Sequence, residues 1–468
     1  MRAAGQAEGG RLFAEDALLP GGWARQVLMQ WDGQGVWQSL HTGSPPPAGV
    51  PRAAGPVIPA LPNLHSHAFQ RALAGLTEYR GSAQDSFWSW RELMYRFAAR
   101  LGPEQVEAIA TWLYLEMLEA GYGSVCEFHY LHHDAHGRPY ADDATLALAL
   151  LRAARRVGIG LTLLPVLYQN SGFGGLAPHG GQRRFLRSTE SMQTLLQRLQ
   201  PLCAAQGARL GLAPHSLRAV TPAALREALA GLEALDATAP VHIHIAEQVA
   251  EVEACVAWSG QRPVEWLLDH LPVDARWCLV HATHMLPEEA RRAARSGAVA
   301  GLCPSTEANL GDGLFDLPGW LASDGAWGLG SDSHVTVNAA EEMLLLEYGQ
   351  RLQRRERNVL ASAAQAHVAT AMTLQAVAGG ARASGRPVAG LAAGQSADFA
   401  VLDAGHLALA GLPAPEMLSA HVFASHRGSA LQELWVGGIR RVCQGRHALH
   451  EQAAADFLGV RRSLLAAP

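Results

Sequence analysis

Short hydrophobic runs alternate with longer amphipathic stretches through the middle of the chain, from residue 57 onward. Eight of the short runs have the length and composition of buried strands: residues 57–64, 123–129, 160–167, 209–213, 241–245, 277–280, 298–302 and 327–330. Strands that alternate with helices are typical of parallel sheets, and eight such units can close into a barrel. The pattern therefore predicts an α/β fold with a (β/α)8 barrel, whose functional residues follow the C-terminal ends of the strands.

The two ends of the chain have a different pattern. Before residue 51, short β-like pieces at 24–29 and 36–39 are separated by Gly and Pro turns, without helical periodicity. Near the other end, residues 396–402 and 431–436 predict strands, and Gly437-Gly438 predicts a tight turn. Because chain termini often lie close together, we predict one small β-sandwich domain built from both ends. The expected division is 1–56 and 386–468 for this domain, with a terminal helix, and 57–385 for the barrel.

Composition and charge narrow the class of protein. The 468 residues carry a net charge of −5, which gives no basic surface for nucleic acid and no polybasic patch for a membrane. Apolar stretches are too short to cross a bilayer, and the N-terminal residues lack the features of an export signal. The six cysteines form no CxxC pair, so we expect reduced thiols and a cytoplasmic protein.

The absence of lysine has direct chemical consequences. All 37 residues counted as Lys or Arg are arginines. Schiff-base catalysis, pyridoxal phosphate attachment and a P-loop lysine all require an amine, so the sequence excludes them. It equally excludes a two-metal site bridged by a carbamylated lysine.

Histidine and aspartate residues stand where several predicted strands end. His65 and His67 follow the first strand, and residues two apart on a strand face the same side. Such a pair alone is weak evidence, but His244 ends the fifth strand, His281 the sixth, and Asp332 follows the eighth. Three imidazoles and one carboxylate suit Zn²⁺, with Fe²⁺ or Mn²⁺ as alternatives. The sequence therefore predicts a mononuclear metal site held by His65, His67, His244 and Asp332.

The remaining strand-end residues predict a hydrolytic reaction. Asp332 can accept a proton from the attacking water as well as bind metal, and His281 can orient that water. Glu247 follows His244 by three residues and can protonate a departing nitrogen. The alternative for His281 is a buried structural histidine, and His242 is expected to lie deeper in the barrel core. This set suits the addition of water to a C=N carbon, followed by loss of ammonia.

The pattern of these residues resembles the amidohydrolase superfamily. Residues 394–403 (GQSADFAVLD) resemble that superfamily's return into the accessory β-sandwich. Five further runs resemble the formimidoylglutamate deiminase family within it: residues 63–76, 127–130, 213–220, 303–313 and 331–334. The resemblance spans the whole chain. It implies one zinc ion, a homodimer, and conversion of N-formimino-L-glutamate and water to N-formyl-L-glutamate and ammonia in histidine degradation. It also implies the four metal ligands above, and Glu247 and His281 as catalytic groups.

Residues near the same strand ends are candidates for binding this dicarboxylate. Gln70 lies three residues past His67, Tyr130 follows the second strand, and His215 and Arg218 follow the fourth. Arginine suits a two-point grip on a carboxylate. A second cation is needed, and Arg91 is a candidate, within its chain or across a subunit boundary. The alternatives are a surface arginine at a helix start for Arg218, rim hydrogen bonds for Gln70 and Tyr130, and packing or an interface for Arg91.

Other functions compete with this hypothesis. Another mononuclear deaminase of the superfamily would act on a purine or triazine ring, where aromatic stacking is expected in place of Arg218. Amide or lactam hydrolysis usually uses two bridged metals in this superfamily, and the missing lysine counts against it. A scaffold that has lost its chemistry is inconsistent with an intact set of ligands and acid–base residues.

Overall fold

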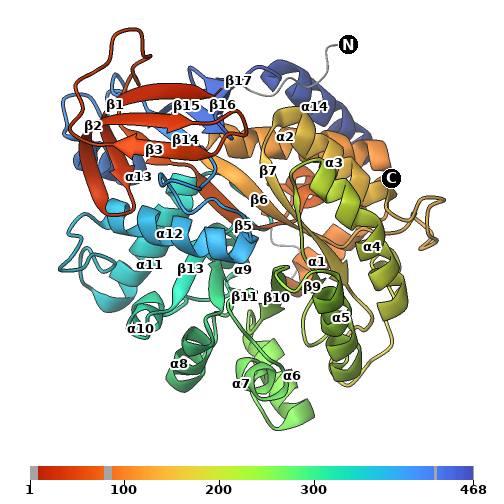
Figure 1. Ribbon diagram of the computed structural model, residues 1–468. Coiled ribbons are helices and arrows are strands. Elements are labelled where there is room, and N and C mark those ends of the chain that lie inside the picture. The colour runs from red at the N-terminus through yellow and green to blue at the C-terminus, as the bar shows by residue number, and fades with distance from the viewer. Residues whose placement is uncertain (1–8, 79–86, 426–429, 467–468) are drawn as a thin grey trace.

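The structure, a computed structural model, describes residues 9–78, 87–425 and 430–466 (Figure 1). A curled parallel sheet with helices around it forms the larger part of the molecule, and a second sheet lies beside it. The predicted α/β class with a parallel sheet is therefore confirmed. None of the helices in the described ranges is both long and apolar enough to cross a membrane.

The curled sheet is parallel at every strand pair and follows the order β10-β11-β12-β13-β5-β6-β7-β8, with β9 also pairing with β7. Its strands are β5 (Leu61–Ser66), β6 (Tyr122–His129), β7 (Gly160–Leu167), β8 (Arg209–Leu210), β9 (Ala213–Pro214), β10 (Val241–Ile245), β11 (Trp277–His281), β12 (Val299–Leu302) and β13 (Ala326–Leu329). Isolated parallel bridges join Leu212 to Val241 and Ser216 to His244. These bridges bring the two edges of the sheet together, and all strands end on one face.

Helices connect most of the successive strands and cover the outside of the curled sheet (Figure 1). They are η1 (Ala68–Leu73), α1 (Phe87–Ala98), α2 (Pro103–Glu119), α3 (Thr145–Val157), η2 (Gly180–Gln182), α4 (Thr189–Ala205), α5 (Pro222–Leu235), α6 (Val249–Ser259), α7 (Pro263–His270), α8 (Pro287–Ser296), α9 (Pro304–Leu310), α10 (Leu317–Leu321), α11 (Ala339–Arg354), α12 (Val368–Ser384), α13 (Ala414–Phe423) and α14 (His450–Ala466). Local chemistry sets their ends. The Thr221 side chain caps α5 by accepting a hydrogen bond from the Ala224 backbone, and Gly158 ends α3 in the left-handed conformation.

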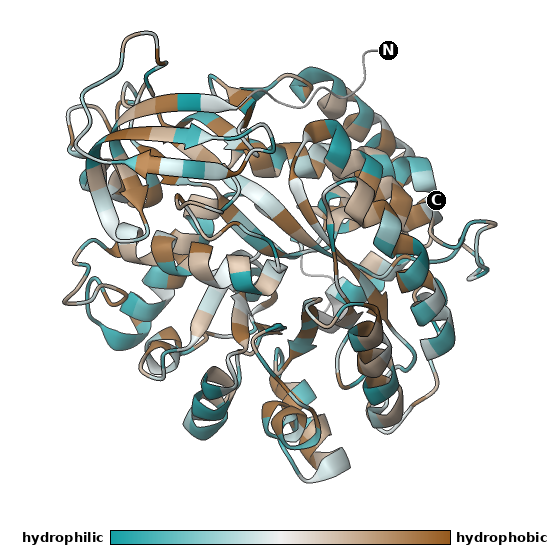
Figure 2. Cartoon of the chain, viewed as in Figure 1, coloured by the Kyte–Doolittle hydropathy of each residue, from teal (hydrophilic) through white to brown (hydrophobic). Residues whose placement is uncertain are grey.

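Hydrophobic burial follows this layering. The strands of the curled sheet are buried almost throughout, whereas outer helices such as α8 expose a hydrophilic surface (Figure 2). All six cysteines lie in the described residues and none forms a disulfide, as the sequence predicts.

The second sheet unites both ends of the chain. Its order is β17-β16-β15-β14-β4-β1-β2-β3. The strands are β1 (Gly10–Leu19), β2 (Gly22–Trp31), β3 (Trp37–His41), β4 (Val57–Pro59), β14 (Phe399–Leu402), β15 (Leu431–Val436), β16 (Ile439–Cys443) and β17 (Arg446–His447). Gly437 and Gly438 both have positive φ in the turn that joins β15 to β16, as their sequence predicts. β1, with its charged residues, was not identified from the sequence.

One predicted strand divides between the two sheets. Residues 57–64 form β4, which pairs with β1 and β14 in the second sheet, and then most of β5 in the curled sheet. Every residue of both strands is buried. Hydrophobic pattern alone therefore cannot mark the point where the chain passes from one sheet to the other.

The fourth predicted strand is also interrupted. Residues 209–213 divide into β8 and the start of β9, separated by Gly211 and Leu212. A Cβ atom on Gly211 would lie 2.5 Å from the Pro240 carbonyl oxygen, so only glycine permits this close approach of two backbones.

Candidate metal centre and active site

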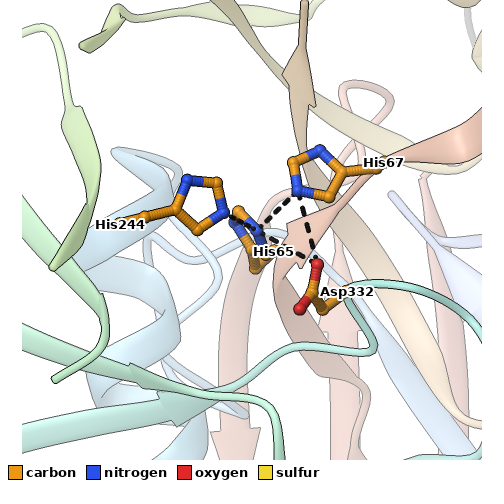
Figure 3. Close-up of side chains that lie close together, drawn as sticks. All are labelled: His65, His67, His244 and Asp332. Atoms are coloured by element: carbon orange, nitrogen blue, oxygen red, sulfur yellow. Dashed lines mark hydrogen bonds and ion pairs between the residues drawn. The ribbon is translucent and has the colours of Figure 1, made fainter. Parts of the chain in front are cut away.

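Four side chains converge where the strands of the curled sheet end (Figure 3). His65 lies in β5, His67 follows it, His244 lies in β10, and Asp332 follows β13. His65 Nε2 is 3.0 Å from both His67 Nε2 and His244 Nε2. Asp332 Oδ1 is 3.4 Å from His65 Nε2 and 3.3 Å from His67 Nε2. All four ligand atoms lie within 4.8 Å of one another.

The hydrogen bonds of the His67 and His244 rings leave their Nε2 atoms free to bind a metal ion. His67 Nδ1 donates to the Phe128 carbonyl at 2.9 Å, and His244 Nδ1 donates to the His215 carbonyl at 3.0 Å. A neutral imidazole that donates through Nδ1 presents a lone pair at Nε2. The lone pairs of His67 and His244 therefore both face His65 Nε2 at 3.0 Å, and a single proton on that nitrogen could satisfy only one of them.

The spacing of the ligand atoms fits a divalent cation. Nitrogen and oxygen ligands about 2.0–2.1 Å from a tetrahedral zinc ion lie about 3.3 Å apart, close to the separations observed here. Burial lowers the pKa of His65, His67 and His244, so all three rings are held in the neutral form that binds metal. The donor set, its spacing and its protonation state all agree with a single metal site.

Buried polar side chains fix the backbone of the ligands. Asn63 Oδ1 accepts hydrogen bonds from the backbone of His65 and of Ser331, each at 3.2 Å. His334 Nε2 accepts from the His67 backbone, also at 3.2 Å. Such partners orient metal ligands and are a regular part of metal sites. Neither His334 nor Asn63 is among the functional residues that the sequence predicts.

Left-handed backbone conformations cluster at the same strand ends. Ten non-glycine residues in the described ranges have positive φ, and five of them follow or end β10, β11 and β13: Ala246, His281, Ala282, Asp332 and His334. Non-glycine residues adopt this conformation at a cost and do so most often at functional sites. Two of the five, His281 and Asp332, are residues of the candidate site.

His281 stands between two carboxylates beside the metal ligands. Its Nε2 atom is 3.6 Å from Asp332 Oδ2 and 3.8 Å from Glu247 Oε1. On the other side of the ring, Nδ1 forms a hydrogen bond of 3.2 Å with Glu307 Oε1, which fixes the ring plane. Burial opposes the charged form, but the surrounding carboxylates outweigh burial and raise the pKa of His281 to about 10. The positive charge of a cation on Asp332 would oppose that rise.

Glu247 has the protonation behaviour of an acid that works near neutral pH. Its side chain is buried, and burial raises its pKa to about 7, although the positive charges of His281 and Arg218 act in the opposite direction. Its backbone N–H donates to Glu251 Oε2 at 3.1 Å, which fixes the loop after β10.

A cavity lies beside the four clustered side chains, and every residue that the sequence assigns to substrate binding lines it. Its lining includes Gln70, Arg91, Tyr130, His215 and Arg218 together with His67, His244, Glu247, His281 and Asp332. His242 is absent from this lining, because its Nε2 atom donates to the Ala383 carbonyl at 2.8 Å deeper in the barrel. Arg91 faces the cavity of its own chain and stacks over the Tyr95 ring at 5.6 Å.

The cationic and polar groups of the cavity have defined partners. The Arg218 Nε atom is 3.9 Å from Glu251 Oε1, and both side chains are largely buried. Gln70 Nε2 donates to the Tyr130 hydroxyl at 2.7 Å. Burial, followed by the charge of Arg218, lowers the pKa of His215, so this ring is neutral.

Several residues of the site could not be found from sequence reasoning. Glu307 contacts His281 from α9, and Glu251 contacts both Arg218 and the Glu247 backbone from α6. Aromatic residues complete the cavity: Trp90, Tyr95, Tyr168 and Phe185. Glu307 lies in a run that resembles a known family, but nothing local indicates that its carboxylate reaches a ring 26 positions away.

Several known proteins are similar to this chain in sequence and in fold. The amidohydrolase family profile matches residues 57–440. Formimidoylglutamate deiminase from Pseudomonas aeruginosa is 52% identical over 455 residues, which cover 97% of this chain and 99% of that protein. The crystal structure of an amidohydrolase from Brucella melitensis has a TM-score of 0.93 at 48% identity, covering 98% of this chain and 100% of that one. An adenosine deaminase from Xanthomonas campestris with bound zinc shares the fold, with a TM-score of 0.80 at 19% identity over 98% of this chain and 99% of that one.

Proposed function

The chain belongs to the amidohydrolase family, and from that premise we propose that it hydrolyses N-formimino-L-glutamate to N-formyl-L-glutamate and ammonia. The observation that carries the proposal is 52% identity to a formimidoylglutamate deiminase over nearly the whole length of both chains. The chain is accordingly an enzyme that hydrolyses a C–N bond other than a peptide bond. In histidine degradation this reaction would remove the imino nitrogen of the formimino group as ammonia.

His65, His67, His244 and Asp332 would hold the metal ion. Their mutual spacing and the neutral state of the three rings support this assignment. A divalent cation in such a site supplies Lewis acidity, which makes water a nucleophile near neutral pH.

The protein's own groups would move the protons. Asp332 accepts a proton from the attacking water, while His281 Nε2, 3.6 Å from Asp332 Oδ2, orients that water toward the formimino carbon. Glu247, on the other side of His281 Nε2, donates a proton to the departing nitrogen. A C=O bond replaces the C=N bond to the terminal nitrogen, and both protons of the attacking water end on that nitrogen, the first through Asp332 and the second through Glu247, so that it leaves as ammonia.

The charges of the cavity support a dicarboxylate substrate. Arg91 and Arg218 both line it, and guanidinium groups donate hydrogen bonds without accepting any. A neutral purine or triazine ring would bring no carboxylate to these two cations. Gln70, Tyr130 and His215 add polar groups for the formimino and glutamate moieties.

Ammonia release tests the reaction directly. Metal-replete protein should release ammonia from N-formimino-L-glutamate far faster than from neutral purines or triazines. Equal or faster release from a neutral heterocycle would overturn the substrate assignment, and it would leave the deaminase chemistry standing.

Arg218→Met is expected to lower kcat/KM for N-formimino-L-glutamate by about ten- to a hundredfold or somewhat more. The reason is the loss of a charge-assisted hydrogen bond worth roughly 1.5–3 kcal/mol. Steady-state kinetics should show a much smaller loss for a formimino compound without carboxylates, because that compound never contacts the arginine.

The control addresses the buried carboxylate that Arg218 faces. Removing the arginine leaves Glu251 without its cation, so Arg218→Met/Glu251→Gln restores the charge balance. The same substrate-dependent loss should persist in the double variant, with an unchanged metal content. Equal losses on charged and uncharged substrates would mean that Arg218 only supports the loop after β9.

Finer assignments complete the proposal. Zinc is the proposed metal, since three imidazoles and one carboxylate suit it, and elemental analysis should give one equivalent per chain. The family resemblance supports a homodimer, which sedimentation analysis tests, and the six free cysteines support a cytoplasmic location. Residues 57–385 are proposed as a (β/α)8 barrel domain, and residues 1–56 and 386–468 as a β-sandwich domain.

A further inference from the structure

The end of the cavity that carries Arg91 and Arg218 also contains two tyrosine hydroxyls. Tyr168 follows β7, Tyr95 lies in α1, and both line the cavity although their side chains are largely buried. The Tyr168 ring packs edge-on against His215, with ring centroids 4.6 Å apart. Tyr168 interacts electrostatically with both arginines and shares a hydrogen bond with Tyr95.

A glutamine outside the cavity determines how Tyr168 can use its hydroxyl. Gln182, in η2, is fully buried. Its Oε1 atom accepts a hydrogen bond from the His179 backbone at 3.0 Å, so the amide orientation is fixed and Nε2 must face the other way. That Nε2 atom donates to the Tyr168 hydroxyl at 2.7 Å. Because the hydroxyl oxygen accepts this bond, its own proton can be donated only away from Gln182, either to the Tyr95 hydroxyl with which it shares a hydrogen bond or to an acceptor in the cavity.

The side chains at this end of the cavity are therefore mainly hydrogen-bond donors. Both guanidinium groups only donate hydrogen bonds, and an anionic acceptor in the cavity would take the Tyr168 proton from the neutral Tyr95 oxygen, which is the weaker acceptor. The natural complement to several convergent donors is a group that only accepts, and among substrate groups that is an ionised carboxylate. Gln182, which does not itself reach the cavity lining, keeps the Tyr168 oxygen as an acceptor on its own side and so directs the hydroxyl proton toward the cavity.

We propose that Tyr168 is a specificity-determining residue that donates a hydrogen bond to a carboxylate of the substrate, and that Gln182 is a positioning residue that directs this bond. The inference rests on the proposed deimination of N-formimino-L-glutamate and deepens it. It adds a neutral hydrogen-bond donor to the two arginines. It also gives a role to the buried Gln182 amide, which contacts Tyr168 from outside the cavity.

Tyr168→Phe tests the donor directly. Three substrates are compared: N-formimino-L-glutamate, N-formimino-L-2-aminobutyrate, which lacks the side-chain carboxylate, and N-formimino-4-aminobutyrate, which lacks the α-carboxylate. The variant should lose about ten- to a hundredfold in kcat/KM on N-formimino-L-glutamate, mainly through KM. It should lose as much on the analogue that keeps the recognised carboxylate and almost nothing on the other one. Similar losses on all three substrates, or none on N-formimino-L-glutamate, would overturn the proposal.

Gln182→Glu tests the positioning role without removing the hydroxyl. A glutamate keeps the bond from the His179 backbone but presents an acceptor to Tyr168, which draws the hydroxyl proton away from the substrate. The same selective rise in KM is expected, and this variant also keeps the proposal testable if Tyr168→Phe does not fold. In the Tyr168→Phe background the glutamate should have no further effect. A further loss there would mean that its charge acts through space, which contradicts the positioning role.

A matched control removes a tyrosine hydroxyl elsewhere. Tyr122 in β6 is fully buried outside the cavity lining, and Tyr122→Phe should keep the kinetics of the unaltered enzyme on all three substrates. Metal content and thermal unfolding are measured for every variant. Failure of the unaltered enzyme to act on N-formimino-L-glutamate would contradict the proposed function. Normal activity without any effect of Tyr168→Phe would contradict only the role of Tyr168.

Discussion

Asp332→Ala is expected to lose both the bound metal and the activity, and His65→Ala is expected to do the same. Each variant removes one of four ligand atoms that lie within 4.8 Å of one another in a buried site. Loss of an outer partner of a metal ligand typically costs 10- to 100-fold in affinity or activity, so loss of a ligand itself should cost more. Elemental analysis after dialysis should fall well below one equivalent per chain, and ammonia release should fall below detection.

His242→Gln provides the matched control for these variants. His242 lies two residues before His244 on the same strand and is equally buried, but it bonds to the Ala383 carbonyl instead of the cluster. This variant should retain its metal equivalent even if its stability falls. A full metal equivalent with near-normal turnover in Asp332→Ala or His65→Ala would disprove the ligand assignment.

Glu247→Gln is expected to keep the metal and lose about 10²–10⁴-fold in turnover. Glutamine has the shape of glutamate but cannot donate the proton that the departing nitrogen requires, and general acid catalysis typically contributes this much. Because burial raises the pKa of Glu247 to about 7, a substantial protonated fraction exists at neutral pH in the unaltered enzyme. The loss should appear in kcat, since Glu247 acts on the reacting atoms.

The comparison variant for Glu247 lies nearby on α6. Glu253 is exposed to solvent, so Glu253→Gln should keep the kinetics and metal content of the unaltered enzyme. If Glu247→Gln turned over normally with its metal bound, Glu247 would be a structural residue and another group would have to protonate the leaving nitrogen.

The strand-end residues were predictable because their arrangement follows from local rules. Residues two apart on a strand face the same side, and parallel strands of one sheet end on the same face. His65, His67, His244 and Asp332 therefore had to lie near one another once the alternating strand and helix pattern was read. The same rule placed His281 beside them, and it separated His244 at the strand end from His242 deeper in the barrel.

The strand boundaries were less predictable where burial is uniform. Residues 57–64 contain only buried positions, although Val57–Pro59 belongs to one sheet and the residues from Leu61 to another. A run of hydrophobic residues predicts that these residues are buried, but it does not predict the sheet to which they belong. The break between β8 and β9 was hidden for a related reason, since the contact of Gly211 with Pro240 joins distant segments.

The sequence by itself determined the class of fold, and it predicted the residues that the structure brings together at the candidate metal site, because periodicity and strand polarity are properties of short segments. Only the tertiary structure decided which partners tune those residues. Three such partners were not predicted: the Glu307 carboxylate that fixes His281, the Glu251 carboxylate beside Arg218, and the Gln182 amide that binds Tyr168. Each partner lies in a different helix, some distance along the chain from the residue that it contacts. Such contacts depend on how helices pack around the sheet, and side-chain packing over long sequence separations leaves no periodic signal in the sequence.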